Sequence, residues 1–343
     1  MRAVGYQHSL PIDDDQALCD IELPMPLYGD GDLLVRVQAV GVNPVDTKVR
    51  RRETPAPGQW RVLGWDCAGV VEAVGADVRG FQPGDRIWYA GALNRPGCQS
   101  EWHAVDARLV GRRPRSLTAP EAAALPLSAI TAWELLEDRL RLPLQAGGIA
   151  GSGSTLLVIG GAGGVGSMLV QLAQRCSGLK VVATASTGEG MTWLEALGAD
   201  AVINHHQPLR PQLEAIGISG IELVASLTHT HVHFEALVDL LRPQGALALI
   251  DDPDPTAINL LSLKRKSLSL HWELMFTRSL FQTEDMGRQG EILTTVADLV
   301  DRGSLRSTAR TFLGAISAAG LRRAHAELEA HHSIGKLVLD GFS

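Results

Sequence analysis

The sequence predicts an α/β protein in which a doubly wound, parallel-sheet domain interrupts a β-rich, barrel-like domain. Residues 1–125 contain short strand-like runs between Gly/Pro turns, residues 126–265 alternate between apolar runs and helical patterns, and residues 266–343 return to the first pattern. A length of 343 residues is enough for two domains of ordinary size. We therefore predict domain boundaries at 1–125, 126–265 and 266–343.

The β-rich part is predicted to be an antiparallel barrel. Residues 33–42 (LLVRVQAVGV) alternate between apolar and polar side chains, as a half-buried strand does. Residues 70–75 and 86–90 are further short apolar runs, with a Pro83–Gly84 turn between them. Short strands joined by such turns are typical of a barrel.

The inserted part is predicted to contain a parallel sheet. It follows an Ala- and Leu-rich helical stretch at 119–140 and a Gly/Ser-rich loop at 147–154. Its apolar runs lack polar alternation, which indicates strands buried on both faces. These runs are residues 155–159, 180–185, 201–203, 221–225 and 246–250. The alternation ends after Asp252, so residues 266–276 and 336–339 are predicted as strands that return to the first domain.

Composition and charge argue against several classes of partner. The net charge of −7 disfavours nucleic acid or an anionic membrane. No stretch of about 18 apolar residues is present, and the N-terminus does not resemble a signal peptide. The four cysteines lie far apart, without a CxxC pair, as is usual for reduced thiols. We therefore expect a cytoplasmic protein with neither nucleic-acid nor membrane partners.

A glycine-rich turn follows the predicted strand at 155–159. It satisfies the pattern G-x-G-x-x-G with Gly161, Ala162, Gly163, Gly164, Val165 and Gly166. Glycines let the backbone approach a pyrophosphate, and the N-terminus of the next helix favours that anion. Apolar residues at helical spacing over 165–176 support such a helix. These six residues are the predicted pyrophosphate site of a dinucleotide cofactor.

The residues after the second predicted parallel strand indicate which cofactor binds. NAD-binding domains usually carry Asp or Glu about 20 residues past the glycines, on the ribose 2′-hydroxyl. This chain has Thr184, Ser186 and Thr187 there, and its first carboxylate is Glu189. Hydroxyls can hydrogen-bond a 2′-phosphate, which a carboxylate would repel. We therefore predict NADPH, although no arginine is present to pair with the phosphate.

Four further segments occur in order along the chain. They are residues 63–75 (LGWDCAGVVEAVG), 81–85 (FQPGD), 122–126 (AAALP) and 335–339 (GKLVL). With the glycine turn, they resemble the medium-chain dehydrogenase/reductase superfamily. The resemblance implies a GroES-like catalytic domain split by a Rossmann domain, an active site in the cleft between them, and a homodimer. We also predict Lys336, in the last segment, as a cofactor-binding residue.

Members of this superfamily differ in whether they bind zinc. In its zinc alcohol dehydrogenases a His of a Gly-His-Glu motif and an earlier Cys bind the catalytic zinc. Here Trp65 and Asn43 stand at those positions, and neither an indole nor an amide is a credible zinc ligand. The four closely spaced cysteines of the structural zinc lobe are also missing. We therefore predict no metal site.

Residues 43–46 (Asn-Pro-Val-Asp) resemble the zinc-free quinone oxidoreductases instead. In that branch the Asn and the Asp line the nicotinamide pocket, and a Thr matching Thr131 faces the cofactor. The resemblance implies these roles for Asn43, Asp46 and Thr131. From the residues alone, Asn43 could equally form a turn, and Thr131 could bond its own helix backbone.

A site without a Lewis acid is poorly suited to oxidise an alcohol, because nothing there lowers the pKa of the hydroxyl group. Such a site is better suited to reduce an activated acceptor. We predict hydride transfer from NADPH to a quinone or an α,β-unsaturated carbonyl. Asn43 and Tyr89 are the candidate hydrogen-bond donors to the developing oxyanion. Met275 and Phe276 either cover the nicotinamide or the substrate, or belong to a core strand.

Two other functions stay open at this point. One is zinc-dependent alcohol dehydrogenase activity, and the other is a non-catalytic NADPH-binding redox sensor. Alternate histidines at 229, 231 and 233 would share a face in a strand and could suit a metal. Their position after an apolar strand favours a loop and a helix start instead. The pairs at 205–206 and 331–332 are predicted to lie on the surface.

Overall fold

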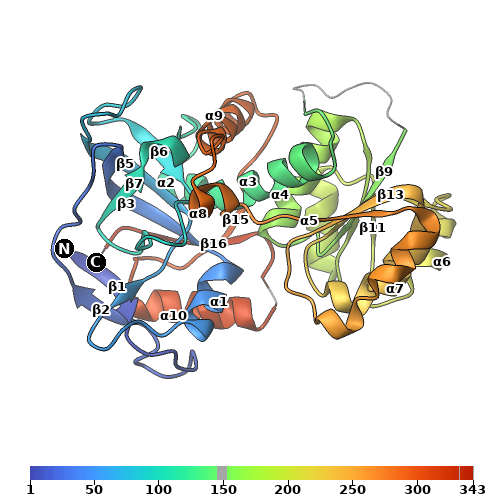
Figure 1. Cartoon of the computed structure of the whole chain (residues 1–343), viewed down its shortest axis with the longest axis horizontal. Helices are drawn as coiled ribbons and strands as arrows, with labels where there is room; N and C mark the ends of the chain where they lie inside the picture. The colour runs from blue at the N-terminus through green and yellow to red at the C-terminus, as the bar shows by residue number, and fades with distance from the viewer. Residues whose placement is uncertain (145–152, 332, 343) are drawn as a thin grey trace. The chain divides into compact units, whose positions relative to one another are not determined.

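The computed structural model describes residues 1–144, 153–331 and 333–342. The chain forms two compact units (Figure 1): unit 1 is Met1–Ile130 with Phe276–Ser343, and unit 2 is Thr131–Met275. The chain thus enters unit 2 five residues after the predicted boundary at 126 and leaves it ten residues after 266. The predicted fold class, a β-rich unit split by a parallel-sheet unit, is confirmed. The loop predicted at 147–154 falls mostly on 145–152, outside the described residues.

Unit 1 is built on two sheets. One has three strands in the order β2-β1-β4, and the other has seven, in the order β15-β16-β3-β5-β6-β8 with β7 also paired to β3. Antiparallel pairing dominates, as the short alternating runs predicted. The strands are β1 (Arg2–Tyr6), β2 (Cys19–Glu22), β3 (Asp32–Val42), β4 (Arg61–Val62), β5 (Cys67–Val74), β6 (Arg86–Tyr89), β7 (Trp102–Asp106), β8 (Val110–Arg112), β15 (Ala309–Phe312) and β16 (Lys336–Asp340).

The central strand β3 shows why this unit forms. Its apolar side chains are buried, whereas Arg36 is exposed and Gln38 is half-buried. Alternation of this kind requires a core on one face and solvent on the other. The helices of unit 1 cover the remaining apolar surface. They are α1 (Pro44–Arg52), α2 (Ala119–Ala123), α8 (Thr277–Phe281), α9 (Arg288–Asp301), α10 (Ala318–Glu329) and a 3₁₀ turn at Ala107–Leu109. Helix α3 (Pro126–Glu134) carries the chain from unit 1 into unit 2.

Unit 2 contains a six-stranded sheet in the order β11-β10-β9-β12-β13-β14, with every neighbouring pair parallel. This is the strand order of a doubly wound nucleotide-binding sheet. The strands are β9 (Thr155–Ile159), β10 (Lys180–Thr184), β11 (Ala201–Ile203), β12 (Ile221–Ser226), β13 (Leu241–Leu249) and β14 (Ser269–Trp272). The helices are α4 (Gly164–Leu172), α5 (Gly188–Leu197), α6 (Leu209–Ala215) and α7 (Thr230–Leu240), with π turns at Leu135–Arg139 and Ala173–Ser177 and 3₁₀ turns at Pro255–Ala257 and Leu260–Lys266.

One predicted strand belongs to the other unit. Residues 266–276 were expected to return to the β-rich domain, but β14 pairs in parallel with β13, with Leu247 opposite Leu270. The reason is that β14 is an edge strand, so it is bordered by a neighbour on one side only and carries polar residues. It therefore lacks the unbroken apolar run that identified the inner strands. The chain re-enters unit 1 only at Phe276.

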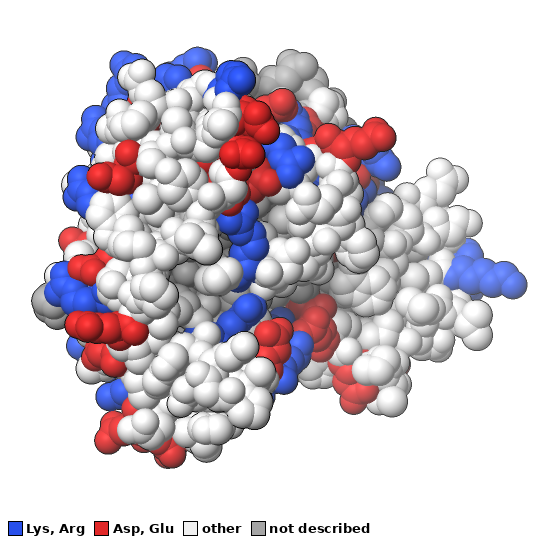
Figure 2. Space-filling model, turned by 60° about the vertical axis from the view of Figure 1, so that its left-hand side comes forward, with Lys and Arg blue, Asp and Glu red and all other residues white. Residues whose placement is uncertain are grey.

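The surface of the molecule carries both signs of charge. On the face shown in Figure 2, acidic and basic side chains occur beside one another and are separated by uncharged areas. Among the described residues, no helix is both long and apolar enough to cross a bilayer.

Candidate functional site

The glycine turn of unit 2 is shaped by close backbone contacts. Strand β9 ends at Ile159, and α4 begins at Gly164 with Gly163 as its N-cap. A Cβ added to Gly166 would lie 2.4 Å from the carbonyl oxygen of Gly161, so any other residue would push the turn away from the helix. At Gly163 the nearest atom to an added Cβ is 4.0 Å away, so this glycine faces open space.

This turn fits the pyrophosphate of a dinucleotide. No side chain caps the N-terminus of α4, so its first N–H groups are left for an acceptor outside the helix. The missing side chain at Gly163 allows an anion to approach the backbone, where the helix dipole favours negative charge. Gly161, Ala162, Gly163, Gly164, Val165 and Gly166 are therefore brought together as predicted, in one turn between β9 and α4.

The three hydroxyls predicted to choose the cofactor have different surroundings. The Thr184 side chain is fully buried, and its oxygen accepts a hydrogen bond from the Gly160 backbone N–H at 3.0 Å. Thr187 caps α5, and its oxygen accepts from the Gly190 N–H at 3.1 Å. Ser186 is exposed. Ser186 and Thr187 thus keep a hydroxyl hydrogen that a phosphate could accept.

A histidine that we predicted as surface lies beside this region. His205 follows β11, and its Nδ1 is 3.1 Å from the Thr184 hydroxyl. Its ring also contacts those of His206 and His233, at centroid distances of 4.8 and 6.0 Å. Burial and these neighbours lower the pKa of His205 to about 4, so the ring is neutral at pH 7. The signal for its position was that it follows the third parallel strand, where polar residues reach the ligand edge of such sheets.

The alternate histidines do not lie in a strand. His229 precedes α7, and His231 and His233 lie in its first turn. Among the described residues, no group of three or more His, Cys, Asp or Glu side chains is placed to hold a metal ion. His332 lies outside the described residues, so the pair predicted at 331–332 is not described as a pair.

Unit 1 contains a buried polar cluster at the segment that we singled out. The ammonium of Lys336 donates to the Val42 carbonyl at 2.9 Å, to an Asp66 carboxylate oxygen at 2.8 Å, and to the side-chain oxygen of Asn43. The amide nitrogen of Asn43 donates in turn to Asp66 at 2.8 Å. All three N–H donors of the Lys336 ammonium are therefore hydrogen-bonded within unit 1. Asn43 uses only one of its two amide hydrogens in the bond to Asp66.

Two carboxylates complete this cluster. Asp66 also accepts from the Leu127 backbone N–H at 2.7 Å, and Asp46 accepts from the Asn43 backbone N–H at 2.8 Å as the third residue of α1. Both aspartates are fully buried. Burial raises the pKa of Asp66, an effect that the Lys336 ammonium opposes. Burial likewise raises the pKa of Asp46, to about 7.

Asp66 was missed by the sequence analysis. The available signal was a carboxylate inside an otherwise apolar segment, directly after Trp65, because a buried carboxylate needs a partner. Its partners come from three other places in the chain, and only folding brings them together. The cluster brings Asn43 and Asp46 together and places Asp66 between Asn43 and Lys336. The role of Asn43 and Asp46 at the nicotinamide stays a prediction.

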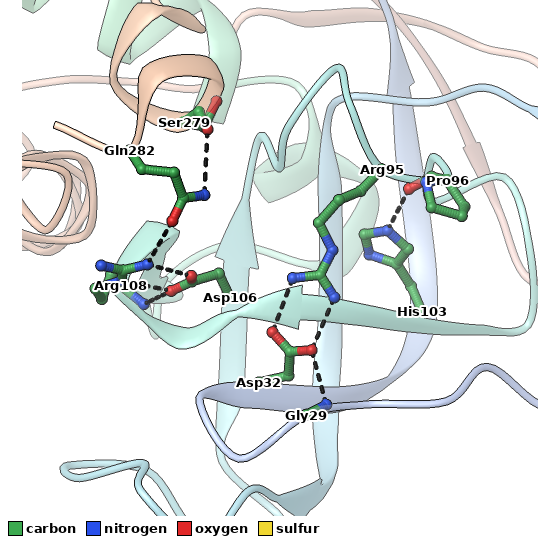
Figure 3. A network of polar contacts seen from close by, with 9 residues as sticks. All are labelled: Gly29, Asp32, Arg95, Pro96, His103, Asp106, Arg108, Ser279 and Gln282. Carbon is green, nitrogen blue, oxygen red and sulfur yellow. Dashed lines mark hydrogen bonds and ion pairs between the residues drawn. The ribbon is translucent and has the colours of Figure 1, made fainter.

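The predicted donor Tyr89 lies in a second buried pair. Its hydroxyl is 2.8 Å from Nδ1 of His103. On the other side of the ring, the His103 Nε2 lies 2.8 Å from the Pro96 carbonyl, as Figure 3 shows. A carbonyl only accepts, so Nε2 carries the proton of the neutral ring and Nδ1 accepts from Tyr89. Burial lowers the pKa of His103 to about 4, which fits the neutral ring, and raises that of Tyr89 well above its usual value. The single hydroxyl hydrogen of Tyr89 is thus directed at His103.

The remaining predicted residues lie near the two points where the chain changes unit. Thr131 is buried at the start of unit 2, and Met275 is buried at its end. Phe276 begins the return to unit 1, where it is buried against Trp65 in an edge-to-face contact with a centroid distance of 6.2 Å. The Trp65 indole N–H donates to the Ala92 carbonyl at 3.2 Å. Trp65 and Phe276 are therefore apolar packing residues of unit 1.

Two protein-family models match the chain. The model for the alcohol dehydrogenase GroES-like domain matches residues 29–119, within unit 1. The model for the zinc-binding dehydrogenase matches residues 197–339, which cover the second half of unit 2 and most of the return segment.

Curated relatives match the chain over its whole length or over part of it. A zinc-type alcohol dehydrogenase-like protein of Staphylococcus epidermidis is 35% identical over 341 residues, 99% of each chain. A quinone oxidoreductase of Lama guanicoe is 30% identical over 261 residues, 75% of each chain. A 2-methylene-furan-3-one reductase of Solanum lycopersicum is 40% identical over 193 residues, 53% of this chain and 46% of that one.

Solved structures share the whole fold. A Rhizobium etli protein, provisionally assigned as a zinc-dependent alcohol dehydrogenase, is 49% identical with a TM-score of 0.94, covering 100% of this chain and 98% of that one. A mycobacterial protein in complex with NADPH is 27% identical with a TM-score of 0.81, covering 99% of each chain.

Proposed function

Because the chain belongs to the medium-chain dehydrogenase/reductase family, we propose that it is an NADPH-dependent oxidoreductase that reduces quinones or α,β-unsaturated carbonyl compounds without catalytic zinc. The family membership makes it an oxidoreductase; the cofactor, the acceptor and the metal-free site are the proposal. The observation that carries it is the buried cluster of Asn43, Asp66 and Lys336. Relatives named as a quinone oxidoreductase and as a 2-methylene-furan-3-one reductase support the acceptor class.

The side chains of this cluster are poorly suited to bind zinc. Catalytic zinc in proteins takes thiolate, imidazole or carboxylate ligands. Asp66 is already neutralised by the Lys336 ammonium at 2.8 Å, and that ammonium also contacts Asn43. A divalent ion beside Asp66 would lie next to a buried positive charge with which it would compete. Trp65 offers no lone pair to a metal, and its indole N–H is bonded to the Ala92 carbonyl.

The residues of unit 2 support a phosphorylated nicotinamide cofactor, which supplies the hydride when it is bound. The turn at Gly161–Gly166 and the N-terminus of α4 would hold its pyrophosphate. Ser186 and Thr187 would donate hydrogen bonds to the 2′-phosphate, and no carboxylate stands at the end of β10 to repel that group. The solved NADPH complex of a relative supports this assignment.

The residues of unit 1 suit an acceptor that becomes negatively charged. Hydride addition to a quinone or an enone places charge on the carbonyl oxygen. The second amide hydrogen of Asn43 would donate to that oxygen, while Asp66 and Lys336 fix the orientation of the amide. Lys336 is therefore a positioning residue that polarises the amide of Asn43. The proton that completes the reduction would come from water.

The test is an assay of NADPH and NADH oxidation against ortho-quinones, para-quinones and α,β-unsaturated aldehydes, each with and without EDTA. We expect NADPH-preferring turnover that EDTA does not change, and a loss of about 100-fold in kcat/KM in Asn43→Ala, the size expected for one oxyanion donor. The exposed Asn94→Ala is a matched control. Alcohol oxidation that EDTA abolishes would overturn the metal-free proposal, and NADPH binding without turnover on any acceptor would favour a sensor.

We also propose a homodimer in the cytoplasm, formed through the edge of the unit 2 sheet. Strand β14 has a paired neighbour, β13, on one side only. Trp272 is 52% exposed there and Leu274 is 49% exposed, which is unusual for large apolar residues. Light scattering should give a dimer mass for the wild type and a monomer mass for Trp272→Lys. A monomeric wild type would refute the dimer.

The proposed cytoplasmic location is supported by the cysteines. All four, Cys19, Cys67, Cys98 and Cys176, are free thiols, as is usual in a reducing compartment.

A further inference from the structure

Unit 1 contains a cavity that is separate from the Asn43 cluster. Its volume is about 620 Å³, and none of the residues that line it belongs to that cluster. Its walls come from β1, β3, β7, the residue after β8, the start of α2 and the end of β16. The side chains that define its chemistry are Arg2, Arg36, Gln38, Trp102, Arg113 and Phe342.

Arg113 is the most unusual of these residues. It is 9% exposed, and one guanidinium nitrogen donates to the Gln38 side-chain oxygen at 2.9 Å. Its Nε is buried without a hydrogen-bond partner, and no carboxylate among the described residues lies within ion-pair distance of it. Burial lowers the pKa of Arg113, which reflects a positive charge that lacks compensation. An anion in the cavity would stabilise a buried guanidinium in this state.

The other charges of the cavity limit the charge of the ligand. Arg2 is paired with Glu101 at 2.6 Å, so these two charges offset each other. Arg36, on the outward face of β3, is exposed and has no ion-pair partner among the described residues. Asp340 stands at the end of β16 and offsets one more positive charge. Three arginines against two carboxylates leave a net charge of +1, which suits a monoanion.

Two aromatic rings supply the apolar part of the cavity. Trp102 and Phe342 are half-buried and line it together. The Arg2 guanidinium lies over the Phe342 ring, 5.7 Å from its centroid, which holds that ring in place. A planar, apolar group could therefore lie against these rings while its charged end reaches Arg113.

We propose that this cavity binds a small aromatic monocarboxylate, with the carboxylate on Arg113 and Arg36 and the ring against Trp102 and Phe342. Nothing in the oxidoreductase reaction requires this site. The proposal therefore holds or fails independently of the proposed function.

The test is calorimetric titration of the full-length protein with benzoate, with NADP⁺ at saturation so that the cofactor site is filled. We expect a Kd on the order of 1 mM, as befits a ligand of this size. Acetate should bind more weakly because it lacks the ring. Inorganic phosphate as a second probe distinguishes a general anion site: equal affinity for phosphate would overturn the aromatic part of the proposal.

Matched variants locate the binding. Arg113→Gln and Arg36→Gln should each weaken benzoate binding at least about tenfold, since each removes a charge-assisted bond. Arg36 is exposed, so its variant keeps the test valid if Arg113→Gln does not fold. Arg112→Gln removes the same charge one residue away, where the side chain is exposed and bonds the Gly80 carbonyl, and should bind as the wild type does. Unchanged binding in both cavity variants, or its loss in Asn43→Ala, would refute the site.

Discussion

The glycine turn of unit 2 and the polar cluster of unit 1 are built in opposite ways. The turn consists of six consecutive residues, and its shape comes from backbone contacts such as that of Gly166 with Gly161. The cluster consists of side chains from α1, from the segment before β5 and from β16, nearly 300 positions apart at the extreme, as in the bond from Lys336 to Asn43 (|i−j| of 293). A site built from backbone can therefore be predicted from local sequence, whereas a site built from distant side chains depends on the folded sheet.

The largest effect should come from breaking the cluster. In Lys336→Met, Asp66 keeps its burial and loses its cation, so we expect the free energy of unfolding to fall by about 3–5 kcal/mol. Chemical denaturation measures it. The double variant with Asp66→Asn removes the uncompensated charge and should recover much of this loss. A double variant no more stable than Lys336→Met would show that packing, and not charge, determines the effect.

A pH dependence should follow from Asp46. Its pKa is raised in the folded state to about 7, so folding favours the protonated form. This stabilising contribution is complete below the unfolded pKa near 4 and is lost as pH rises through about 7. Asp46→Asn should therefore gain stability relative to the wild type between about pH 4 and 7, by up to about 4 kcal/mol. The exposed Asp13→Asn is the control, and parallel stability curves for wild type and Asp46→Asn would contradict the shift.

The corresponding break in unit 2 should act on binding. An alanine Cβ at Gly166 would meet the Gly161 carbonyl at 2.4 Å, so Gly166→Ala must displace the turn. We expect NADPH affinity to fall about 100-fold, equivalent to about 2.7 kcal/mol. Fluorescence titration of the bound nicotinamide measures this. Gly188→Ala, where an added Cβ meets nothing within 4 Å, should bind normally. Equal affinities for Gly166→Ala and wild type would remove the turn from the cofactor site.

The smallest effect concerns cofactor choice. Ser186→Ala removes one exposed hydroxyl that would donate to a 2′-phosphate, so the preference for NADPH over NADH should fall about fivefold, the value of roughly one hydrogen bond. The ratio of the two dissociation constants measures it. A ratio that does not change would contradict this role of Ser186. His205, which lies beside Thr184, would then be the next residue to test.

The sequence predicted the fold more completely than the site. The inner strand β9 was predicted to the residue, because strands buried on both faces are uniformly apolar. The start of β13 was missed by five residues, because Leu241–Gly245 carries exposed polar residues. Strand β14 was assigned to the wrong unit, because an edge strand carries polar residues that resemble those of the β-rich unit. Asn43 was predicted through a local motif. Asp66 was missed, because its role is defined by Lys336 and Leu127, which are distant in sequence.

The ammonium of Lys336 also bears on how such a protein could change its chemistry. A chain that already places a lysine ammonium in this cluster cannot gain a metal site by acquiring a single ligand. Trp65→His alone would place an imidazole beside an occupied charge site, where Lys336 and Asp66 already satisfy each other. Asn43, Trp65 and Lys336 would have to change together, and each intermediate would leave a charge or a polar group buried alone. The proposed metal-free site would therefore be separated from a zinc-binding one by an energetic barrier in sequence space.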